Sequence, residues 1–254
     1  MPVQDPTQRF SSRVDNYVRY RPGYPPEVVE LLKSECGLAS HSVIADIASG
    51  TGIFTRLLLE SGSRVWGVEP NPEMRRAGEE FLAGYPRFTS VAGSAEATTL
   101  SEHRVDIVTA AQAAHWFDTA KTRREFLRIL KPGGWCVLLW NERRTDTTPF
   151  LRAYEELLWT YGTDYQDVRH ERTTASIDLF YAPSQFQERV FENKQELDYA
   201  ALEGRLLSSS YTPQRDDPNY GAMLHELRRI FDKDQRDGSV TVEYNTRVYF
   251  GRLG

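Results

Sequence analysis

The stretch VIADIASGTGIFT, residues 43–55, decides the fold. Residues 43–48 form a short apolar run that predicts a strand, and residues 53–60 return to helical spacing. Gly50 and Gly52 lie between them and allow a ligand to touch the main chain. A loop that joins a parallel strand to a helix also presents free amide groups and the positive end of the helix dipole. The stretch therefore predicts a ligand-binding loop at the edge of a sheet.

Strand-like and helix-like segments alternate around this loop. Helical spacing covers residues 26–35 and 71–82, where Asn71 and Pro72 form a favourable helix start. It returns in TRREFLRILKPGG, where a Pro-Gly-Gly turn at residues 132–134 is predicted to separate the helix from the next strand. Further strands are predicted in RVWGVEP, RFTSVAGSAE, VDIVTAAQAAHWF and WCVLLWNE. Five strands separated by helices within about 100 residues imply right-handed crossovers and a parallel sheet covered on both faces. We expect a doubly wound α/β fold.

The pattern changes after residue 141. Residues 141–211 read as helix-rich and carry many aromatic residues, for which core packing is favoured over a pocket lining. The chain then continues with a helix, GAMLHELRRIFDKD, and an alternating strand, SVTVEYNTRVYFGRL. We expect one domain over residues 1–254, with its core in 26–142 and 212–254. An N-terminal lid would occupy residues 1–25, and a helical insertion over residues 143–211 would act as a substrate lid.

Composition excludes several classes of partner. The chain has 31 Lys and Arg against 36 Asp and Glu, and no long block of one charge, which argues against a nucleic-acid partner. No apolar run approaches the roughly 20 residues that span a membrane, and the first residues lack a signal-peptide core, so we expect a cytoplasmic protein without a membrane partner. Cys36 and Cys136 lie far apart beside apolar residues, and reduced structural thiols are expected. No spacing of histidines and cysteines predicts a metal site.

Two carboxylates and one missing glycine limit the class of ligand that this loop would bind. Asp46 precedes the glycine loop, where it would repel a pyrophosphate and attract an ammonium group. Thr55 stands where a dinucleotide-binding fingerprint has glycine or alanine. Glu69 follows Gly52 by 17 residues and suits a carboxylate that accepts hydrogen bonds from ribose hydroxyls. We therefore expect a ligand with a ribose and an amine but no phosphates, and an NAD(P)-dependent oxidoreductase remains the alternative enzyme class.

The successive motifs resemble those of a known family. VIADIASGTG, VWGVEPNPEM, VAGSAEATTL, VDIVTAAQAAHWF and ILKPGGWCVLLWNE follow one another along the chain. In this order they resemble the motifs of class I S-adenosylmethionine-dependent methyltransferases. YVRYRPGYP at residues 17–25 and QAAHWF resemble the type 11 branch, which includes trans-aconitate methyltransferases. The resemblance implies a mostly parallel, seven-stranded sheet with an antiparallel last strand, S-adenosylmethionine as the cofactor and S-adenosylhomocysteine as the product.

The resemblance also implies a set of cofactor contacts along the carboxyl edge of the sheet. Two positions depart from the family pattern: Ala48-Ser49 replaces the usual Gly-Cys, and Ser94 stands where many relatives have an acidic residue. From the methionine end through the ribose to the adenine, the implied contacts are Asp46, Ser49, Gly50, Thr51 and Gly52, then Glu69, then Pro70, Met74, Ser94, Ala95 and Glu96, with Gln112 beneath the methionine portion.

Each candidate for a substrate contact has a second interpretation that the sequence leaves open. His115 is the candidate general base, but an imidazole packed against Trp116 is an equally good interpretation. Tyr17 and Arg21 belong to a segment that would fold across the cofactor or form a plain surface turn. Arginines suit a substrate carboxylate because they donate paired hydrogen bonds, although most arginines are surface charges. The candidates for this clamp are Arg143, Arg144 and Arg205.

These observations together predict a small-molecule methyltransferase. The reaction expected is direct displacement at the methyl carbon, with a carboxylate oxygen as the candidate acceptor, and alignment supplies most of the rate. A cofactor-binding protein without catalytic activity is the alternative outside the enzymes. The expected assembly is a monomer or a homodimer.

Overall fold

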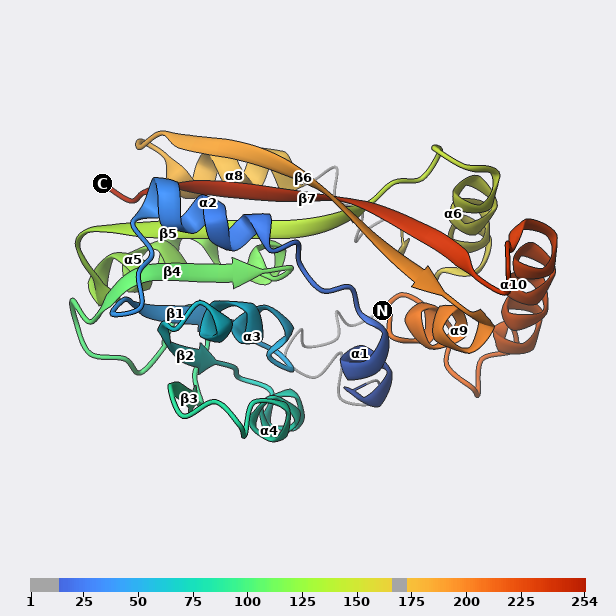
Figure 1. Cartoon of the computed structure of the whole chain (residues 1–254), viewed down its shortest axis with the longest axis horizontal. Coiled ribbons are helices and arrows are strands. Elements are labelled where there is room, and N and C mark those ends of the chain that lie inside the picture. The colour runs from blue at the N-terminus through green and yellow to red at the C-terminus, as the bar shows by residue number, and fades with distance from the viewer. Residues whose placement is uncertain (1–13, 166–172) are drawn as a thin grey trace.

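The structure, a computed structural model, describes residues 14–165 and 173–254. A twisted seven-stranded sheet forms its centre, in the order β3-β2-β1-β4-β5-β7-β6 (Figure 1). Strands β1 to β5 pair in parallel, whereas β7 is antiparallel to both of its neighbours. The predicted doubly wound sheet with an antiparallel last strand is confirmed. The strands are β1 (Val43–Ile47), β2 (Arg64–Val68), β3 (Phe88–Val91), β4 (Val105–Ala111), β5 (Leu130–Arg143), β6 (Phe186–Leu197) and β7 (Val240–Arg252).

Helices cover both faces of this sheet. Because side chains alternate along a strand, Ile44 packs with the helices of one face and Ala45 with those of the other. Helices α2 and α3 cover the first face, and α5 and α8 cover the second (Figure 1). The helices are α1 (Val14–Tyr20), α2 (Glu27–Cys36), α3 (Ile53–Glu60), α4 (Pro72–Phe81), α5 (Thr119–Ile129), α6 (Pro149–Tyr161), α8 (Thr173–Tyr181), α9 (Tyr199–Leu207) and α10 (Tyr220–Asp234), with a short 3-10 helix, η2, at Ala114–Trp116.

The start of α4 is the clearest local signal in the sequence. The Asn71 side chain accepts hydrogen bonds from the amides of Glu73 and Met74, both at 2.9 Å. Pro72 supplies the first helical residue, where its missing N–H costs no hydrogen bond. Asn71 and Pro72 therefore fix the point at which the chain leaves β2, and with it the position of Glu69.

A second hydrophobic cluster lies beyond the sheet. Residues Val240–Glu243 of β7 pair with β6 alone, so these two strands run past the end of β5. Apolar side chains of α6, α9 and α10 pack around their extension, and Figure 1 shows these helices grouped at that end of the molecule. We call this group the second lobe. It draws on residues from both sides of the predicted boundary at residue 211.

Two local predictions need correction. The Pro-Gly-Gly turn at residues 132–134 was expected to separate a helix from a strand, but β5 already begins at Leu130 and the three residues fall where its pairing with β4 shifts register. Residues 141–211 were expected to be helix-rich, yet β6 occupies residues 186–197. From Phe191 to Leu197, partly buried and exposed residues alternate, which is the period of a strand with one half-buried face.

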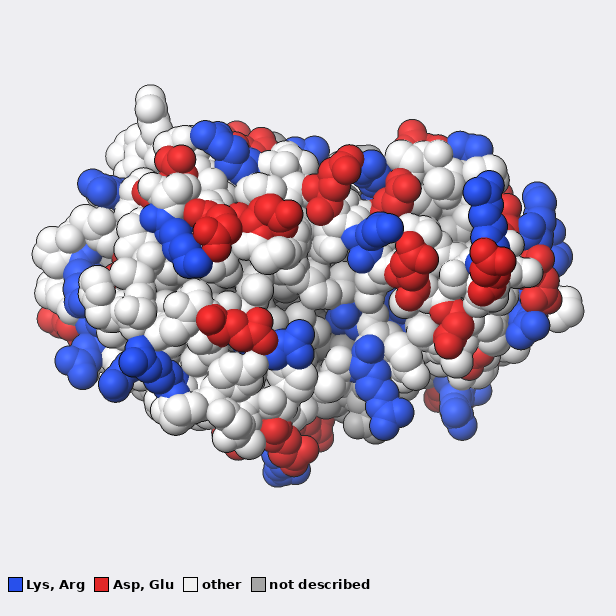
Figure 2. Space-filling view, viewed as in Figure 1, with Lys and Arg blue, Asp and Glu red and all other residues white. Residues whose placement is uncertain are grey.

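Positive and negative side chains are mixed on the surface. In Figure 2, Lys and Arg are interspersed with Asp and Glu across both lobes of the visible face.

Within residues 14–165 and 173–254, none of the helices combines the length and apolarity needed to cross a membrane. Over the same ranges, no three His, Cys, Asp or Glu side chains gather into a group suited to a metal ion. Cys36 and Cys136 are buried and unbridged.

Candidate functional site

A cavity of about 500 Å³ opens where β1 and β4 end, at the point where the order of the strands reverses. In open α/β sheets this crevice is the usual place for a ligand. The predicted site residues that line the cavity are Arg21, Asp46, Ser49, Gly50, Thr51, Gln112, His115, Trp116, Arg143 and Arg205. Those that do not line it are Gly52, Glu69, Pro70, Met74, Ser94, Ala95, Glu96 and Arg144. The side chain of Tyr17 lies outside the described part of the structure.

The glycine loop has a strongly constrained backbone. Gly50 and Gly52 have φ values of 57° and 84°, in the left-handed region that favours glycine. Ala48 shares this conformation with a φ of 53°, at a position where the related motif has glycine. A Cβ atom on Gly52 would lie 2.7 Å from Leu82, so no larger residue fits without movement. This geometry turns the chain tightly between β1 and α3 and leaves Gly50 open to the cavity.

Asp46 lies at the base of the cavity and is almost fully buried. Its carboxylate accepts hydrogen bonds from the hydroxyls of Thr55, at 2.6 Å, and Thr109, at 2.8 Å. Burial raises the pKa of Asp46 to about 6, and the two hydroxyls oppose this rise. Both partners are neutral, so the charge of the carboxylate is not balanced within the cavity floor. A cationic group placed here would be stabilised.

Glu69 fixes the backbone of the glycine loop through hydrogen bonds. Its two carboxylate oxygens accept from the amides of Gly50, at 2.9 Å, and Asn71, at 2.8 Å. Burial raises the pKa of Glu69, and these two hydrogen bonds act against the rise. Met74 packs under Gly50, and Gly78 lets α4 approach the loop so closely that an added Cβ would lie 3.0 Å from the Gly50 carbonyl oxygen. The sequence signals a role for Glu69 and Met74, but it gives no signal for Gly78.

The end of β4 is fixed by contacts to β5. Gln112 adopts a φ of 60°, and its amide donates to the carbonyl of Leu139 at 2.9 Å. Its side-chain amide donates to the carbonyl of Asn141 at 3.3 Å. Gln112 therefore lines the cavity at the end of β4, the strand that pairs with β1.

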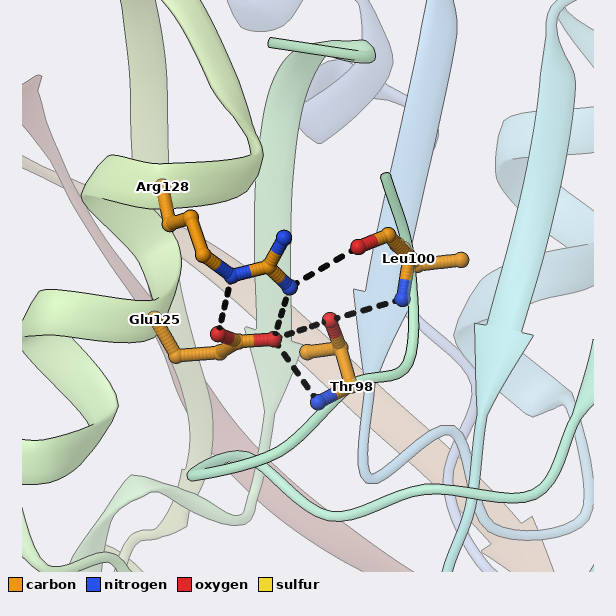
Figure 3. A network of polar contacts seen from close by, with 4 residues as sticks. All are labelled: Thr98, Leu100, Glu125 and Arg128. Carbon is orange, nitrogen blue, oxygen red and sulfur yellow. Dashed lines mark hydrogen bonds and ion pairs between the residues drawn. The ribbon is translucent and has the colours of Figure 1, made fainter. Parts of the chain in front are cut away.

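The segment predicted to flank an adenine is tied to α5 (Figure 3). Glu125 accepts hydrogen bonds from the amide of Thr98, at 2.9 Å, and from its hydroxyl, at 2.5 Å. Arg128 pairs with Glu125 at 2.6 Å and donates to the carbonyl of Leu100 at 2.8 Å. Ser94, Ala95 and Glu96 were expected to end the third strand, but β3 ends at Val91 and they follow it as a loop. The network holds Thr98 and Leu100, which continue this loop, against α5.

We predict that Glu125→Gln destabilises the fold in a pH-dependent manner. Burial by itself raises the pKa of Glu125, but hydrogen bonds from Arg128 and Thr98 outweigh it and lower the pKa to about 2. The carboxylate therefore contributes stability above pH 4.5, its ordinary pKa, and the contribution fades as the pH falls through about 2. The expected loss at pH 7 is up to about 3 kcal/mol, measured by urea unfolding of the variant and the wild type.

The matched control for this prediction is Glu80→Gln, because Glu80 is an exposed residue of α4. It should change the unfolding free energy by less than about 0.5 kcal/mol at any pH. A difference between Glu125→Gln and wild type that is as large at pH 3 as at pH 7 would show that the carboxylate charge is not what stabilises the loop.

The wall of the cavity in the second lobe is rich in arginine. Arg205 on α9 is buried and donates to Ser209 at 3.1 Å and to Tyr244 at 3.3 Å. Arg143, at the end of β5, is paired with Glu155 and donates to Tyr165 at 3.0 Å. Burial alone would raise the pKa of Tyr211, but the guanidinium groups of Arg205, Arg143 and Arg21 outweigh it and lower that pKa. The wall therefore carries a positive potential.

The end of α1 and the residue after it contact the second lobe, and Arg21 also lines the cavity. Arg21 donates to the carbonyl of Ser208 at 2.8 Å, and Gln195 donates to the carbonyl of Tyr20 at 3.2 Å. The ring of Tyr20 packs directly on Gly204 of α9, because an added Cβ there would collide with it. The described part of the predicted N-terminal lid thus lies against the second lobe.

The remaining candidates are His115 and Arg144. His115 is exposed at the mouth of the cavity, and its ring lies 4.6 Å from that of Trp116. Arg144 bonds to Asn245 at 2.9 Å and to Glu192 at 3.0 Å, outside the cavity. The structure therefore separates Arg144 from Arg143 and Arg205. Sequence spacing does not distinguish the three arginines.

Comparisons with known proteins agree with this geometry. Residues 45–138 match the family described as "Methyltransferase domain". An uncharacterized methyltransferase of Mycobacterium tuberculosis is 35% identical over 164 residues, which is 65% of this chain. The alignment spans 64% of that relative's length.

Solved structures share the fold at low sequence identity. The YcgJ protein of Bacillus subtilis matches with a TM-score of 0.56 at 19% identity, over 90% of this chain and 99% of that one. Phosphoethanolamine N-methyltransferase 2 of Haemonchus contortus, in complex with phosphomonomethylethanolamine and S-adenosylhomocysteine, matches with a TM-score of 0.54 at 16% identity, over 96% of this chain and 57% of that one. The predicted resemblance is confirmed: residues 45–138 match the methyltransferase domain, and the chain shares its fold with a solved methyltransferase.

Proposed function

We propose that the protein transfers the methyl group of S-adenosylmethionine to a small-molecule acceptor, and that a carboxylate oxygen of the acceptor receives it. The observation that carries the proposal is that one cavity is lined both by the buried carboxylate of Asp46 and by the arginines Arg143 and Arg205. The Asp46 carboxylate favours a cationic cofactor beside it, and the arginines favour an anionic acceptor. The match to the methyltransferase domain supports the reaction class.

The residues present fit the cofactor. Asp46 is a buried carboxylate whose only hydrogen-bond partners among the described residues are threonine hydroxyls, so it would accept from the ammonium group of the methionine end. Glu69 uses one acceptor position of each oxygen for a backbone amide, and a carboxylate has about four such positions, so ribose hydroxyls would use the others. Gly50 lines the cavity without a side chain, and its φ of 57° disfavours any residue that has one.

The chemistry then needs mainly alignment. When bound, S-adenosylmethionine supplies a methyl group already activated by a positively charged sulfur. An acceptor oxygen would bond to this methyl carbon as the carbon–sulfur bond breaks and its electron pair returns to sulfur. No proton leaves a carboxylate in this step. The chain contributes by holding both partners in line and excluding water, and such alignment is worth roughly 7–11 kcal/mol.

Two measurements test the proposal in sequence. Calorimetry should first show that the purified protein binds S-adenosylmethionine, and a protein that binds a nicotinamide dinucleotide instead would contradict the reaction class. A panel of small carboxylic acids is then incubated with the cofactor carrying an isotopically labelled methyl group. A labelled methyl ester would support the proposal. Labelled product only from amines or alcohols would retain the methyltransferase and remove the carboxylate acceptor.

The proposed acceptor makes a prediction for His115. His115→Ala should leave the single-turnover rate within about threefold of wild type on the carboxylic acid found in that panel, because no base is required. A loss of about 10²–10⁴-fold would indicate that a proton is removed and would contradict a carboxylate acceptor. Affinity for the cofactor serves as the control for a change in the shape of the mouth.

A further inference from the structure

Arg205 is a buried charge that has no carboxylate partner within residues 14–165 and 173–254. It is 8% exposed, and its hydrogen bonds within the described residues go to the hydroxyls of Ser209 and Tyr244. Its strongest electrostatic neighbours are tyrosines. A guanidinium removed from water costs several kcal/mol unless a charge of opposite sign approaches it. An arrangement of this kind is stable when an anion completes it.

Among the described residues, Glu155, Glu142 and Glu188 are each paired with an arginine other than Arg205. Glu155 balances Arg143 from outside the cavity, because it accepts from Arg143, Tyr165 and Trp159 and does not line the cavity. Glu142 and Glu188 line the cavity on the sheet side, where both are bound to Arg247 at 2.5 Å. The Nη1 atom of Arg143 is buried and has no hydrogen-bond partner within residues 14–165 and 173–254.

We propose that Arg205, Arg143 and Tyr211 form an anion subsite in the second lobe, which holds a carboxylate or phosphate group of the acceptor other than the group that is methylated. The proposal rests on the proposed function, because it assigns one end of the acceptor of that same site. Three observations carry it. The cavity connects these residues with Asp46, and in the part of the chain that the structure describes Arg205 has no acidic partner and the Nη1 atom of Arg143 has no acceptor.

The held group and the methylated group must be different. Guanidinium donors bind an oxyanion through its lone pairs, often two at a time. Those lone pairs are then engaged, which lowers the nucleophilicity of the same oxygen atoms. The two arginines come from α9 and the end of β5, whereas Asp46 and Ser49 belong to the sheet edge. An acceptor with an anchoring anion at one end and its nucleophile at the other fits this separation.

Calorimetry on protein saturated with S-adenosylhomocysteine tests the proposal, since the cofactor site is then filled. The probes are succinate, which carries carboxylates, glycerol 3-phosphate, which carries a phosphate, and dimethyl succinate, which is neutral. We expect at least one anionic probe to bind, and Arg205→Gln to weaken its binding by about tenfold or more. The tighter of the two anionic probes identifies the preferred oxyanion, and dimethyl succinate should not bind.

Matched variants separate the charge from the fold. Arg144→Gln should leave the binding of every probe within about twofold of wild type, because Arg144 lies outside the cavity. Arg205→Lys keeps the charge but loses the planar fork, so a smaller loss of about threefold or more is expected. If thermal unfolding shows that Arg205→Gln does not fold, Arg205→Lys tests the subsite instead. Anion binding that is unchanged in a folded Arg205→Lys protein would then overturn the proposal.

Three results would overturn the subsite. They are anion binding that is unchanged in a folded Arg205→Gln protein, absence of binding of both anionic probes to wild type, and a loss of S-adenosylhomocysteine affinity in Arg205→Gln equal to its loss of probe affinity. The last result would assign Arg205 to the cofactor carboxylate. Wild-type protein that fails to bind S-adenosylhomocysteine at all contradicts the proposed function instead, so the two failures are distinguishable.

Discussion

Glu69→Ala is expected to lower the affinity for S-adenosylmethionine by about 100-fold. A hydrogen bond to a charged acceptor contributes about 1.5–3 kcal/mol, and the cofactor ribose would lose two of them. The same carboxylate also accepts from the amides of Gly50 and Asn71, at 2.9 and 2.8 Å. Its removal would therefore also release the glycine loop from the end of β2. Calorimetric titration of the variant measures the loss directly.

The second role of Glu69 calls for a graded set of variants. Glu69→Gln keeps an acceptor for one of the two amides but removes the charge, so its affinity should lie between those of wild type and Glu69→Ala. Glu73→Ala is the control, because Glu73 is exposed in the first turn of α4, close to the same loop. If a folded Glu69→Ala protein binds the cofactor as wild type does, the ribose assignment is wrong.

The sequence predicts those parts of the site that depend on neighbouring residues. Gly50 and Gly52 predict a tight turn because few other residues adopt the left-handed conformation. Asn71 and Pro72 predict the start of α4, and this start fixes Glu69 just after β2. In each case the physical cause lies within a few residues of its effect. These elements occur in the structure at or within one residue of the predicted positions.

The sequence does not predict contacts that depend on pairing across the fold. Thr109 donates to Asp46 only because the two residues face each other in the pairing of β1 with β4, 63 residues apart. Arg205 and Arg143 reach one cavity because β6 and β7 carry α9 past the end of β5. Composition and spacing give Arg144 the same standing as Arg143, and only the three-dimensional arrangement separates them.

The Pro-Gly-Gly segment shows how a local signal is overridden. Proline and two glycines typically end an element, and the prediction of a turn at residues 132–134 follows from that. In the structure, Leu130 already pairs with Val105, and pairing resumes at Trp135 with Ile107. The intervening residues bulge out of the ladder, with Gly133 at a φ of 77°. The pairing partner, which the local sequence does not reveal, decides where β5 begins.

Acidification should weaken cofactor binding through Asp46. Burial raises the pKa of Asp46 to about 6, and the proposed contact to an ammonium group requires the ionised form. Below pH 6 a proton must be released on binding, so affinity should fall by about tenfold per pH unit. Glu69 contributes in the same direction, since burial also raises its pKa. Titrations from pH 5 to 8 in buffers of different ionisation enthalpy measure both the affinity and the released protons.

Asp46 should affect the free protein with the opposite sign. A carboxyl group whose pKa is raised on folding stabilises the fold fully below its ordinary pKa of 3.8, and this contribution is lost as the pH rises through about 6. Above pH 6 the ionised side chain therefore costs the free protein about 3 kcal/mol, and a bound cation relieves part of that cost. The cofactor should consequently raise the unfolding temperature more at pH 8 than at pH 5.

Asp46→Asn separates this charge effect from shape. The amide has the same size but cannot ionise, so cofactor affinity at pH 8 should fall by about 30- to 100-fold and become less dependent on pH. The free variant should lose the pH-dependent destabilisation, although its amide nitrogen cannot accept from the second threonine hydroxyl. If the variant retains the full pH dependence of wild type, the titrating group is Glu69, and the assignment of the ammonium contact to Asp46 fails.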